Sequence, residues 1–448
     1  MGGTDGSRTC GDNLHPAYMN AAPLLSIIIP VRDQWPLTRQ CLHSLRAATS
    51  GDFFEVIMVD NASRDATLEA CSPLGHELFG ERFAVLRQET NLGFGPACNL
   101  AAHTAQGELL FFLNNDTVPK PGWFEPLHGA LTAEPDLGAA GPLLVYPSPE
   151  QSTEQSTDTD GTPQTKSECS QTQHLGIAFC LQKRPHHLYE HFPARHPLVR
   201  KKRRVLALTG AALLLPRTLF LTLGGFFPGY INGYEDLELC ARIRQQGLAL
   251  RCVPKSTIIH YTSQTPGRFD HDQANAGLLH ERCAALITPD LHRHLAQDGL
   301  KLSLTPWLLP HAAQQDEDFD RLAPLAQSPL PVLLDLLEAH PLWQDGYEAA
   351  GRLLQEKAAW YQTLKIRLRQ ANLCPSLAAY THLLRAALKC GQKNLAAETQ
   401  NKIAVINRIL AAPHPLRRKA AHLANQARML GEEDMERLYR EAYTPDHC

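Results

Sequence analysis

The chain has 448 residues, of which 44% are hydrophobic and 20% are charged, and its formal net charge is -3. A soluble chain of this length exceeds the size at which one hydrophobic core usually stops growing, so we expect two domains. The small negative charge argues against a global nucleic-acid-binding surface, and we predict no nucleic acid partner.

The cysteines and the N-terminal residues bear on where the protein resides. The 12 cysteines are scattered without a Cys-x-x-Cys pair, which indicates free thiols in a reducing cytosol. Residues 1–20 are polar and glycine-rich and lack the apolar region of a signal peptide. The most apolar window, residues 205–227, contains proline, arginine and glycines, so it predicts a buried strand and a turn, not a membrane span. We expect a cytoplasmic protein with a disordered tail over residues 1–23.

The next part of the chain predicts alternating strands and helices. Apolar runs typical of buried strands cover residues 24–30, 53–59, 84–86 and 109–113. Apolar residues at helical spacing follow each of the first three runs. This alternation with short connections predicts an α/β fold, with a mostly parallel sheet and helices on both faces.

Polar or glycine-rich residues follow these predicted strands. They are Asp60 and Asn61, residues 91–95, and the triplet Asn114, Asn115 and Asp116. Ligands in open α/β sheets bind outside the carboxyl ends of the strands, so this edge is a candidate nucleotide site. The Gly-x-Gly in residues 91–95 lacks a third glycine at dinucleotide-binding spacing, and a plain turn explains it equally well.

Asp116 has two interpretations. A carboxylate at the end of a buried strand can hold Mg²⁺ or Mn²⁺ together with substrate phosphates. A polar triplet at a strand end also forms an Asx turn without any metal. The triplet alone slightly favours the turn.

Two polar segments interrupt the middle of the chain. Residues 147–172 are rich in Ser, Thr, Gln, Asp, Glu and Pro, which predicts a mobile surface insertion. Residues 200–204 are all cationic. A phosphate-bearing acceptor or an anionic membrane surface could bind such a run, but a solvated loop is the interpretation we favour.

Acidic residues and a histidine stand at the ends of two later predicted elements. Glu235 and Asp236 lie in the first turn of a predicted helix, where the helix dipole stabilises negative charge. A carboxylate at that position can also take a proton from an acceptor hydroxyl, and spacing does not choose between the two roles. His260 ends an apolar run; such a histidine is more often structural than a metal ligand.

The C-terminal part has a different composition. Residues 301–333 hold many prolines and an acidic cluster, which predicts a linker. From residue 334 to 448 apolar residues recur at helical spacing, notably over 347–361, 377–388 and 395–409. The spacing of Tyr347 and Tyr380 weakly resembles a tetratricopeptide-type helical repeat.

Taken in order, these motifs resemble the family 2 glycosyltransferases, which are inverting enzymes with a GT-A fold. The resemblance covers residues 24–295 and rests on the segments 26–30, 59–63, 91–95 with Asn99, 113–117, 224–226 with Glu235 and Asp236, and 253–254 with His260. The Asn-Asn-Asp triplet in place of Asp-x-Asp is similar to bacterial rhamnosyltransferase-like members that build surface polysaccharides. The resemblance implies a GT-A domain over residues 24–300, followed by the all-α region.

The resemblance also implies roles for individual residues. The donor-binding residues it implies are Pro30, Asp60, Asn61, Asn91, Gly93, Asn99 and Asn115. Asn61 stands where many relatives have an aspartate that reads uracil, so the base stays open. Asp116 and His260 would hold the divalent cation, Mn²⁺ or Mg²⁺. Asp236 would be the catalytic base, and Glu235 would shape the acceptor pocket.

The implied function is transfer of a sugar from a nucleoside-diphosphate sugar to an acceptor hydroxyl with inversion, in bacterial surface glycan or glycoconjugate synthesis. The acceptor would be a glycan, a lipid-linked molecule or a protein. We also consider peripheral association with the inner face of the membrane and a protein partner on the C-terminal helices. Two alternatives stay open: a scaffold that binds sugar nucleotides without transfer, and a nucleotidyltransferase.

Overall fold

The computed structural model describes residues 22–147, 170–262 and 270–442. Most of the predicted tail (1–23) and of the predicted insertion (147–172) therefore lies outside the described residues. Thr172, the last residue of the predicted insertion, is buried and begins a strand.

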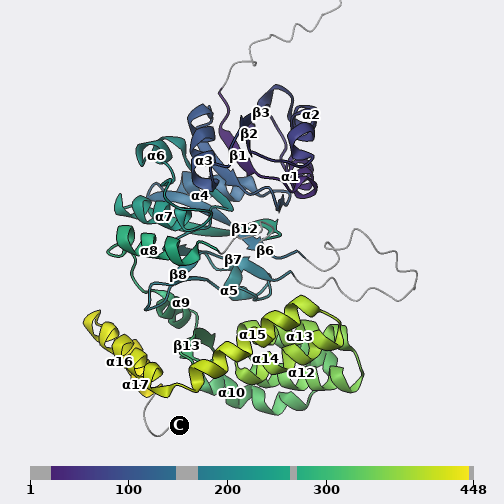
Figure 1. The fold of residues 1–448 in the computed structure, drawn as a ribbon, viewed down its shortest axis with the longest axis vertical. Coiled ribbons are helices and arrows are strands. Elements are labelled where there is room, and N and C mark those ends of the chain that lie inside the picture. Colours follow the sequence, from purple (N-terminus) through teal and green to yellow (C-terminus); the bar gives the residue numbers. More distant parts are fainter. Residues whose placement is uncertain (1–21, 148–169, 263–269, 443–448) are drawn as a thin grey trace, which may run out of the picture.

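A mostly parallel sheet organises the first part of the chain (Figure 1). Its order is β10-β12-β6-β11-β4-β1-β2-β3, with β5 on β12 and β7 on β6. The strands are β1 (Leu25–Val31), β2 (Phe54–Asn61), β3 (Phe83–Gln88), β4 (Leu109–Leu113), β5 (Thr117–Pro119), β6 (Leu137–Val145), β7 (Thr172–His174), β10 (Arg203–Val205), β11 (Ala212–Pro216) and β12 (Ala249–His260). Because β11 runs antiparallel to both β4 and β6, the strands β3, β2, β1, β4, β6 and β12 all point the same way. Their carboxyl ends therefore meet at one edge.

Helices cover both faces of this sheet. One face carries α1 (Trp35–Ala48), α2 (Thr67–Phe79) and α4 (Phe124–Ala133), and the other carries α3 (Phe94–Thr104), α6 (Arg217–Thr222) and α7 (Glu235–Gln245). The side chains of β4 alternate between the two cores: Leu110 and Phe112 face one, and Leu109, Phe111 and Leu113 face the other. The predicted α/β architecture is confirmed, and the continuous apolar run of β4 follows from burial on both faces.

Smaller elements close the α/β part. They are the hairpin β8 (Ile177–Phe179) and β9 (Pro185–His187), and the helices α5 (Pro197–Arg200), α8 (Asp272–Cys283) and α9 (Leu291–Gln297). Most of the basic run next to α5 is paired within the protein. Lys201 and Arg203 contact Asp298, and Arg204 contacts Asp136. Arg200 ends α5, and Arg203 and Arg204 begin β10, so these residues do not form the solvated loop that the sequence favoured.

Residues 301–333, for which the sequence predicts a linker, contain both strands and helices. They form the hairpin β13 (Lys301–Leu304) and β14 (Pro310–Ala313), then α10 (Asp316–Leu322), a short 3-10 helix (Ala323–Gln327) and the start of α11 (Leu330–Ala339). The prolines stand at element boundaries: Pro310 opens β14, Pro324 lies at the start of the 3-10 helix, and Pro331 lies in the first turn of α11. Proline is tolerated at these positions because its missing N–H would have no partner there.

The C-terminal region is helical, as predicted. Its helices are α12 (Gln344–Glu356), α13 (Trp360–Leu373), α14 (Leu377–Lys389), α15 (Lys393–Leu410), α16 (Pro413–Met429) and α17 (Glu433–Glu441). Helices α11 to α15 each pack on the next, and α16 packs on α17 beyond the β13–β14 hairpin (Figure 1). Assignment to a tetratricopeptide-type repeat stays a prediction. In the part of the chain that the structure describes, we find no helix with the length and apolar character needed to cross a membrane.

Gly107, two residues before β4, packs directly against the backbone of β1 and leaves no room for a side chain. A Cβ on Gly107 would lie 2.6 Å from the Ser26 backbone nitrogen, and this backbone cannot move without disturbing the β1–β4 ladder. We expect Gly107→Ala to lower the free energy of unfolding by about 1–3 kcal/mol, measured by urea denaturation. The matched control is Gly129→Ala, because Gly129 lies in the exposed part of α4 with open space around it. That change should be neutral or stabilise by up to about 1 kcal/mol; equal losses in both variants would contradict the account.

Candidate active site

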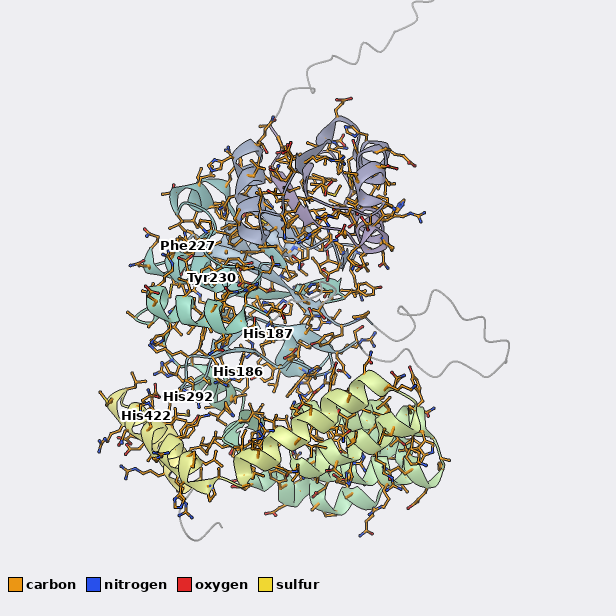
Figure 2. All side chains as sticks on the ribbon, viewed as in Figure 1. His186, His187, Phe227, Tyr230, His292 and His422 are labelled. Carbon is orange, nitrogen blue, oxygen red and sulfur yellow. The ribbon has the colours of Figure 1, made fainter. Side chains whose placement is uncertain are left out.

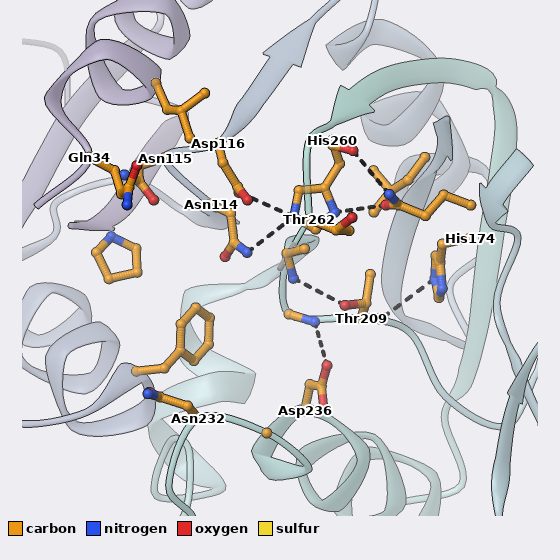
Figure 3. A pocket seen from close by; sticks show the side chains of 18 of the residues that line it. Gln34, Asn114, Asn115, Asp116, His174, Thr209, Asn232, Asp236, His260 and Thr262 are labelled. Carbon is orange, nitrogen blue, oxygen red and sulfur yellow. Dashed lines mark hydrogen bonds and ion pairs between the residues drawn. The ribbon is translucent and has the colours of Figure 1, made fainter. Parts of the chain in front are cut away.

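A cavity of about 520 Å³ opens at the edge where the parallel strands end. It collects residues that are far apart in the sequence (Figure 3). Of the predicted site residues, those that line it are Pro30, Asn61, Asn91, Asn115, Asp116, Glu235, Asp236 and His260. Asp60, Gly93 and Asn99 do not line it, and their side chains or backbone serve the loops around it instead.

Asp116 and His260 form the centre of one wall. His260 Nε2 lies 3.1 Å from Asp116 Oδ1, and both side chains are almost completely buried. The backbone brings them together, because β5 pairs antiparallel with the end of β12 and places His260 opposite Thr117. The Tyr261 N–H also donates to the Asp116 carbonyl oxygen. The site thus joins the end of β4 with the end of the distant β12.

Gln173 on β7 fixes the orientation of the His260 ring. His260 Nδ1 lies 2.7 Å from Gln173 Oε1, and Gln173 Nε2 donates to the His260 carbonyl oxygen at 3.0 Å. An amide oxygen only accepts hydrogen bonds, so Nδ1 carries the ring proton and Nε2 of the neutral ring carries a lone pair. Asn114 Nδ2 approaches that nitrogen at 3.4 Å. Gln173 therefore directs a lone pair of His260 at the carboxylate of Asp116.

This arrangement fits a divalent cation. Asp116 Oδ1 is buried and receives no hydrogen bond from any described residue, so two electron-pair donors face each other. Two ligands at right angles around one ion, each about 2.1 Å from it, lie about 3 Å apart, which matches this separation. The described residues contain no group of three or more His, Cys, Asp or Glu side chains placed to hold a metal. Further ligands would have to come from a bound molecule or from water.

Asp236 lies on another wall of the same cavity, at the start of α7 (Figure 3). Its Oδ2 accepts a hydrogen bond of 2.7 Å from the Gly210 N–H, and its Oδ1 accepts one of 2.8 Å from the Leu237 N–H. The neighbouring Glu235 is buried, and its Oε2 accepts from the Gly233 N–H at 2.6 Å. Both carboxylates are thus fixed by the backbone of the loops that lead into the cavity.

Asp60 and Asn61 organise loops. Asp60 is completely buried, accepts from the Ser63 N–H and lies 3.4 Å from the Arg87 guanidinium. Asn61 donates to the Gly93 carbonyl oxygen and accepts from the Leu92 N–H, so both ends of its amide hold the loop after β3. Any contact of Asn61 with a nucleotide base would use the second N–H or the second oxygen lone pair of this amide.

Asn99 holds the Gly-Gly-Phe loop. Its Nδ2 donates to the Phe226 carbonyl oxygen and its Oδ1 accepts from the Phe226 N–H, both at 2.8 Å. The loop comes so close that a Cβ on Gly225 would lie 2.4 Å from Asn99 Oδ1. The conformation of Gly225, with φ of +70°, independently favours glycine. Asn99 therefore affects the shape of the cavity through this loop and not by lining it.

The sequence did not single out several residues that line the cavity. These are Tyr146, Gln173, His174, His187 and Glu190. Tyr146 directly follows β6, and His260 ends β12. The position of Tyr146 after an apolar run was the one sequence signal that could have predicted its place in the cavity. His174 is buried, and burial lowers its pKa well below the usual range, so this ring is neutral.

Comparison with known proteins places this site in context. Residues 26–186 match the family model described as glycosyl transferase family 2. The O-antigen biosynthesis protein RfbC of Myxococcus xanthus is 30% identical over 55% of this chain and 18% of its own length. The N-acetylglucosaminyl-diphospho-decaprenol L-rhamnosyltransferase of Mycobacterium tuberculosis is 24% identical over 60% of this chain and 85% of its own length. This chain spans less than a third of the length of its first two curated relatives. The crystal structure of GalNAc-T7 with UDP, GalNAc and Mn²⁺ aligns over 53% of this chain and 44% of its own, with 19% identity and a TM-score of 0.42.

The role of Asn99 can be tested by removing its amide. In Asn99→Ala the buried N–H and C=O of Phe226 lose their partners, so we expect a loss of about 2 kcal/mol or more in the free energy of unfolding. Hydrogen exchange of the Phe226 amide should accelerate as well. The control Asn401→Ala, on the exposed face of α15, should leave both measurements close to wild type. Unchanged exchange at Phe226 would show that other contacts hold this loop.

Proposed function

Since residues 26–186 are a glycosyltransferase family 2 domain, we propose that this protein is an inverting glycosyltransferase that moves a sugar from a nucleoside-diphosphate donor to an acceptor hydroxyl. One observation supports this most: the Asp116–His260 pair and Asp236 open into one cavity from separate elements. The pair could hold a cation at the leaving diphosphate, and Asp236 could take the proton of the attacking hydroxyl.

The donor would lie across the carboxyl ends of the first strands. Pro30, Asn61 and Asn91 line this side of the cavity, next to Asn115 and Asp116. Asn115 Nδ2 donates to Thr38 Oγ1 at 2.9 Å, which fixes the turn after β4 against α1. A nucleotide bound here would extend its diphosphate towards Asp116 and His260, as expected for a ligand at this edge of an α/β sheet.

Asp116 Oδ1 and His260 Nε2 would hold a divalent cation, Mn²⁺ or Mg²⁺, together with oxygens of the donor diphosphate. When bound, such an ion offsets the negative charge that develops on the leaving nucleoside diphosphate. The protein contributes the geometry: the β5–β12 ladder sets the distance between the two ligands, and Gln173 sets the proton position on His260.

Asp236 would act as the general base. As the acceptor oxygen bonds to the anomeric carbon, its proton passes to the Asp236 carboxylate, and the bond from that carbon to the diphosphate oxygen breaks with its electron pair on the leaving group. A single displacement of this kind inverts the anomeric centre. The hydrogen bonds from Gly210 and Leu237 hold the carboxylate in place before the acceptor arrives.

Two relatives support a role in surface glycan synthesis. One is named for O-antigen biosynthesis, and the other is named as a rhamnosyltransferase that acts on a diphospho-decaprenol. We infer from these names an acceptor of the glycan or lipid-linked class. A protein acceptor, a cytoplasmic location and association with a membrane or a partner protein remain predictions.

A thermal-shift screen of sugar nucleotides with and without Mn²⁺ tests the proposal. A ligand bound only by the native protein raises its apparent stability, so the correct donor should raise the melting temperature, and more so with Mn²⁺. The stabilising donor should then be converted to a nucleoside diphosphate. Release of pyrophosphate would instead indicate a nucleotidyltransferase, and binding without turnover of any donor would indicate a scaffold.

The base assignment predicts the behaviour of Asp236→Asn. The amide cannot take the proton, so we expect transfer to fall by at least about a hundredfold while nucleotide affinity with Mn²⁺ stays within about threefold of wild type. Transfer is measured as glycoside formation, and affinity by calorimetry. The matched control is Asp335→Asn, because Asp335 is exposed on α11, away from the cavity. Full turnover in Asp236→Asn would exclude Asp236 as the base.

The His260 tautomer predicts the effect of Gln173 substitutions on metal binding. Gln173→Leu removes the acceptor for Nδ1–H, and we expect Mn²⁺ to bind about 10- to 100-fold more weakly in the presence of nucleoside diphosphate, measured by calorimetry. Gln173→Glu keeps an acceptor at the same position and should retain most of the affinity. Gln344→Leu on the exposed start of α12 serves as the control. Equal Mn²⁺ affinity in wild type and Gln173→Leu would contradict the assignment.

A further inference from the structure

One wall of the cavity has no role in the mechanism above. It carries Tyr146 at the end of β6, His174 on β7, His187 at the end of β9, and Glu190 just beyond. In Figure 2 His187 lies on the side of the α/β part that faces the C-terminal helices. These side chains share the cavity with Asp236, so a molecule that offers a hydroxyl to Asp236 would lie beside them.

The two histidines determine each other's proton positions. The Thr209 N–H donates to His174 Nε2 at 3.4 Å, so neutral His174 carries its proton on Nδ1. That Nδ1 lies 3.0 Å from His187 Nδ1 and donates to it. Neutral His187 therefore carries its proton on Nε2. No described residue accepts a hydrogen bond from this N–H, which leaves it available in the cavity.

Glu190 supplies the opposite function. Tyr146 Oη donates to Glu190 Oε1 at 2.6 Å, and the Tyr146 ring stacks on His191 with centroids 5.3 Å apart and planes 3° from parallel. Burial and the neighbouring carboxylate raise the pKa of Tyr146, so the phenol remains a donor. Within the described part of the chain no group donates to Oε2, and the Glu190 side chain is 38% exposed.

The wall is also held from behind. His196 Nε2 lies 3.2 Å from the Ala339 carbonyl oxygen at the end of α11, and Phe192 belongs to a core that includes Leu337 of that helix. The backbone of the segment after Glu190 pairs with the start of β7, since the His191 N–H donates to the Thr172 carbonyl oxygen and the Thr172 N–H donates to the Phe192 carbonyl oxygen. The C-terminal helices thus support the segment that carries Glu190.

Charge distinguishes this wall further. Desolvation lowers the pKa of His187, and the carboxylates of Glu190 and Asp236 oppose that shift in part. With His174 and His187 neutral, the side chains here that carry charge are the carboxylates. An anionic group placed beside them would be repelled, whereas hydroxyl and ammonium groups would be accepted.

We propose that His187 Nε2–H and Glu190 Oε2 form the acceptor subsite, which binds adjacent hydroxyls of a neutral or amino sugar ring and rejects hexuronates. A vicinal diol offers both a donor and an acceptor, and this wall presents the complementary pair. The inference rests on the proposed transferase function and adds the charge class of the acceptor.

The test uses the full-length protein, Mn²⁺ and the donor identified by thermal shift. Methyl glycosides of glucose, glucosamine and glucuronic acid serve as acceptor probes, and glycosylated products are quantified by mass spectrometry. Hydrolysis of the donor without acceptor is measured in parallel. We expect wild type to use the neutral and amino glycosides at least about tenfold more efficiently than the glucuronide, as one unfavourable charge contact would produce.

Variants assign this selectivity to the wall. Glu190→Gln should lower kcat/KM for the neutral glycoside about tenfold, mainly through KM, and should bring the glucuronide within about threefold of it. Tyr146→Phe should show a smaller effect in the same direction. His187→Gln keeps an N–H donor and should exceed His187→Ala in activity. The control Glu433→Gln, on the exposed start of α17, should match wild type in both glycoside formation and donor hydrolysis.

The outcomes separate this proposal from the proposed function. Absence of donor hydrolysis and transfer in wild type with every donor would overturn the transferase itself. Donor hydrolysis without glycosylation of any probe, or equal use of the glucuronide and the neutral glycoside by wild type, would overturn the acceptor subsite alone. Unchanged selectivity in Glu190→Gln would do the same.

Discussion

The antiparallel pairing of β5 with the end of β12 is the constraint on which the site depends. It sets His260 opposite Thr117 and so brings its imidazole to 3.1 Å from the carboxylate of Asp116. Asp116 and His260 are far apart in the sequence, and the shared direction of β4, β6 and β12 brings the ends of their strands to one edge. β7 pairs with β6 at the same edge and delivers Gln173 to the far side of the imidazole. The backbone pairing of these strands thus fixes Asp116 Oδ1 and His260 Nε2 as two neighbouring electron-pair donors.

In the absence of a ligand, the buried Asp116–His260 pair lowers the stability of the folded protein. A buried carboxylate oxygen without a donor forfeits hydration that the protein does not replace, and proteins retain such groups mainly where a ligand completes them. The rest of the cavity is arranged around this need: one side offers strand ends suited to a nucleotide, and the other offers Asp236 and a wall of neutral donors and a carboxylate. The match of residues 26–186 to the family 2 model and the local chemistry therefore support the same proposed division into donor and acceptor halves.

The sequence predicted more of the fold than of the residues that orient the side chains of the site. Continuous apolar runs identified β1, β2 and β4, because burial on both faces removes polar alternation. The ends of those runs pointed to Asp116, while spacing alone did not choose between a helix-start carboxylate and a base for Asp236. Gln173 and His187 carried no signal, since an isolated glutamine or histidine acquires its role from partners that only the fold assembles. Nothing in the sequence indicated that Asp60 and Asn99 bond to the loops around the cavity, or that the prolines of residues 301–333 stand at the boundaries of helices and strands.

The central claim is that Asp116 and His260 together hold the cation that binds the donor diphosphate. Anomalous diffraction at the manganese edge, from crystals grown with Mn²⁺ and the stabilising nucleoside diphosphate, tests it most directly. The account predicts a peak within about 2.3 Å of both Asp116 Oδ1 and His260 Nε2, with diphosphate oxygens completing the coordination. A nucleotide bound with its metal elsewhere, or bound without any ion at this pair, would contradict it.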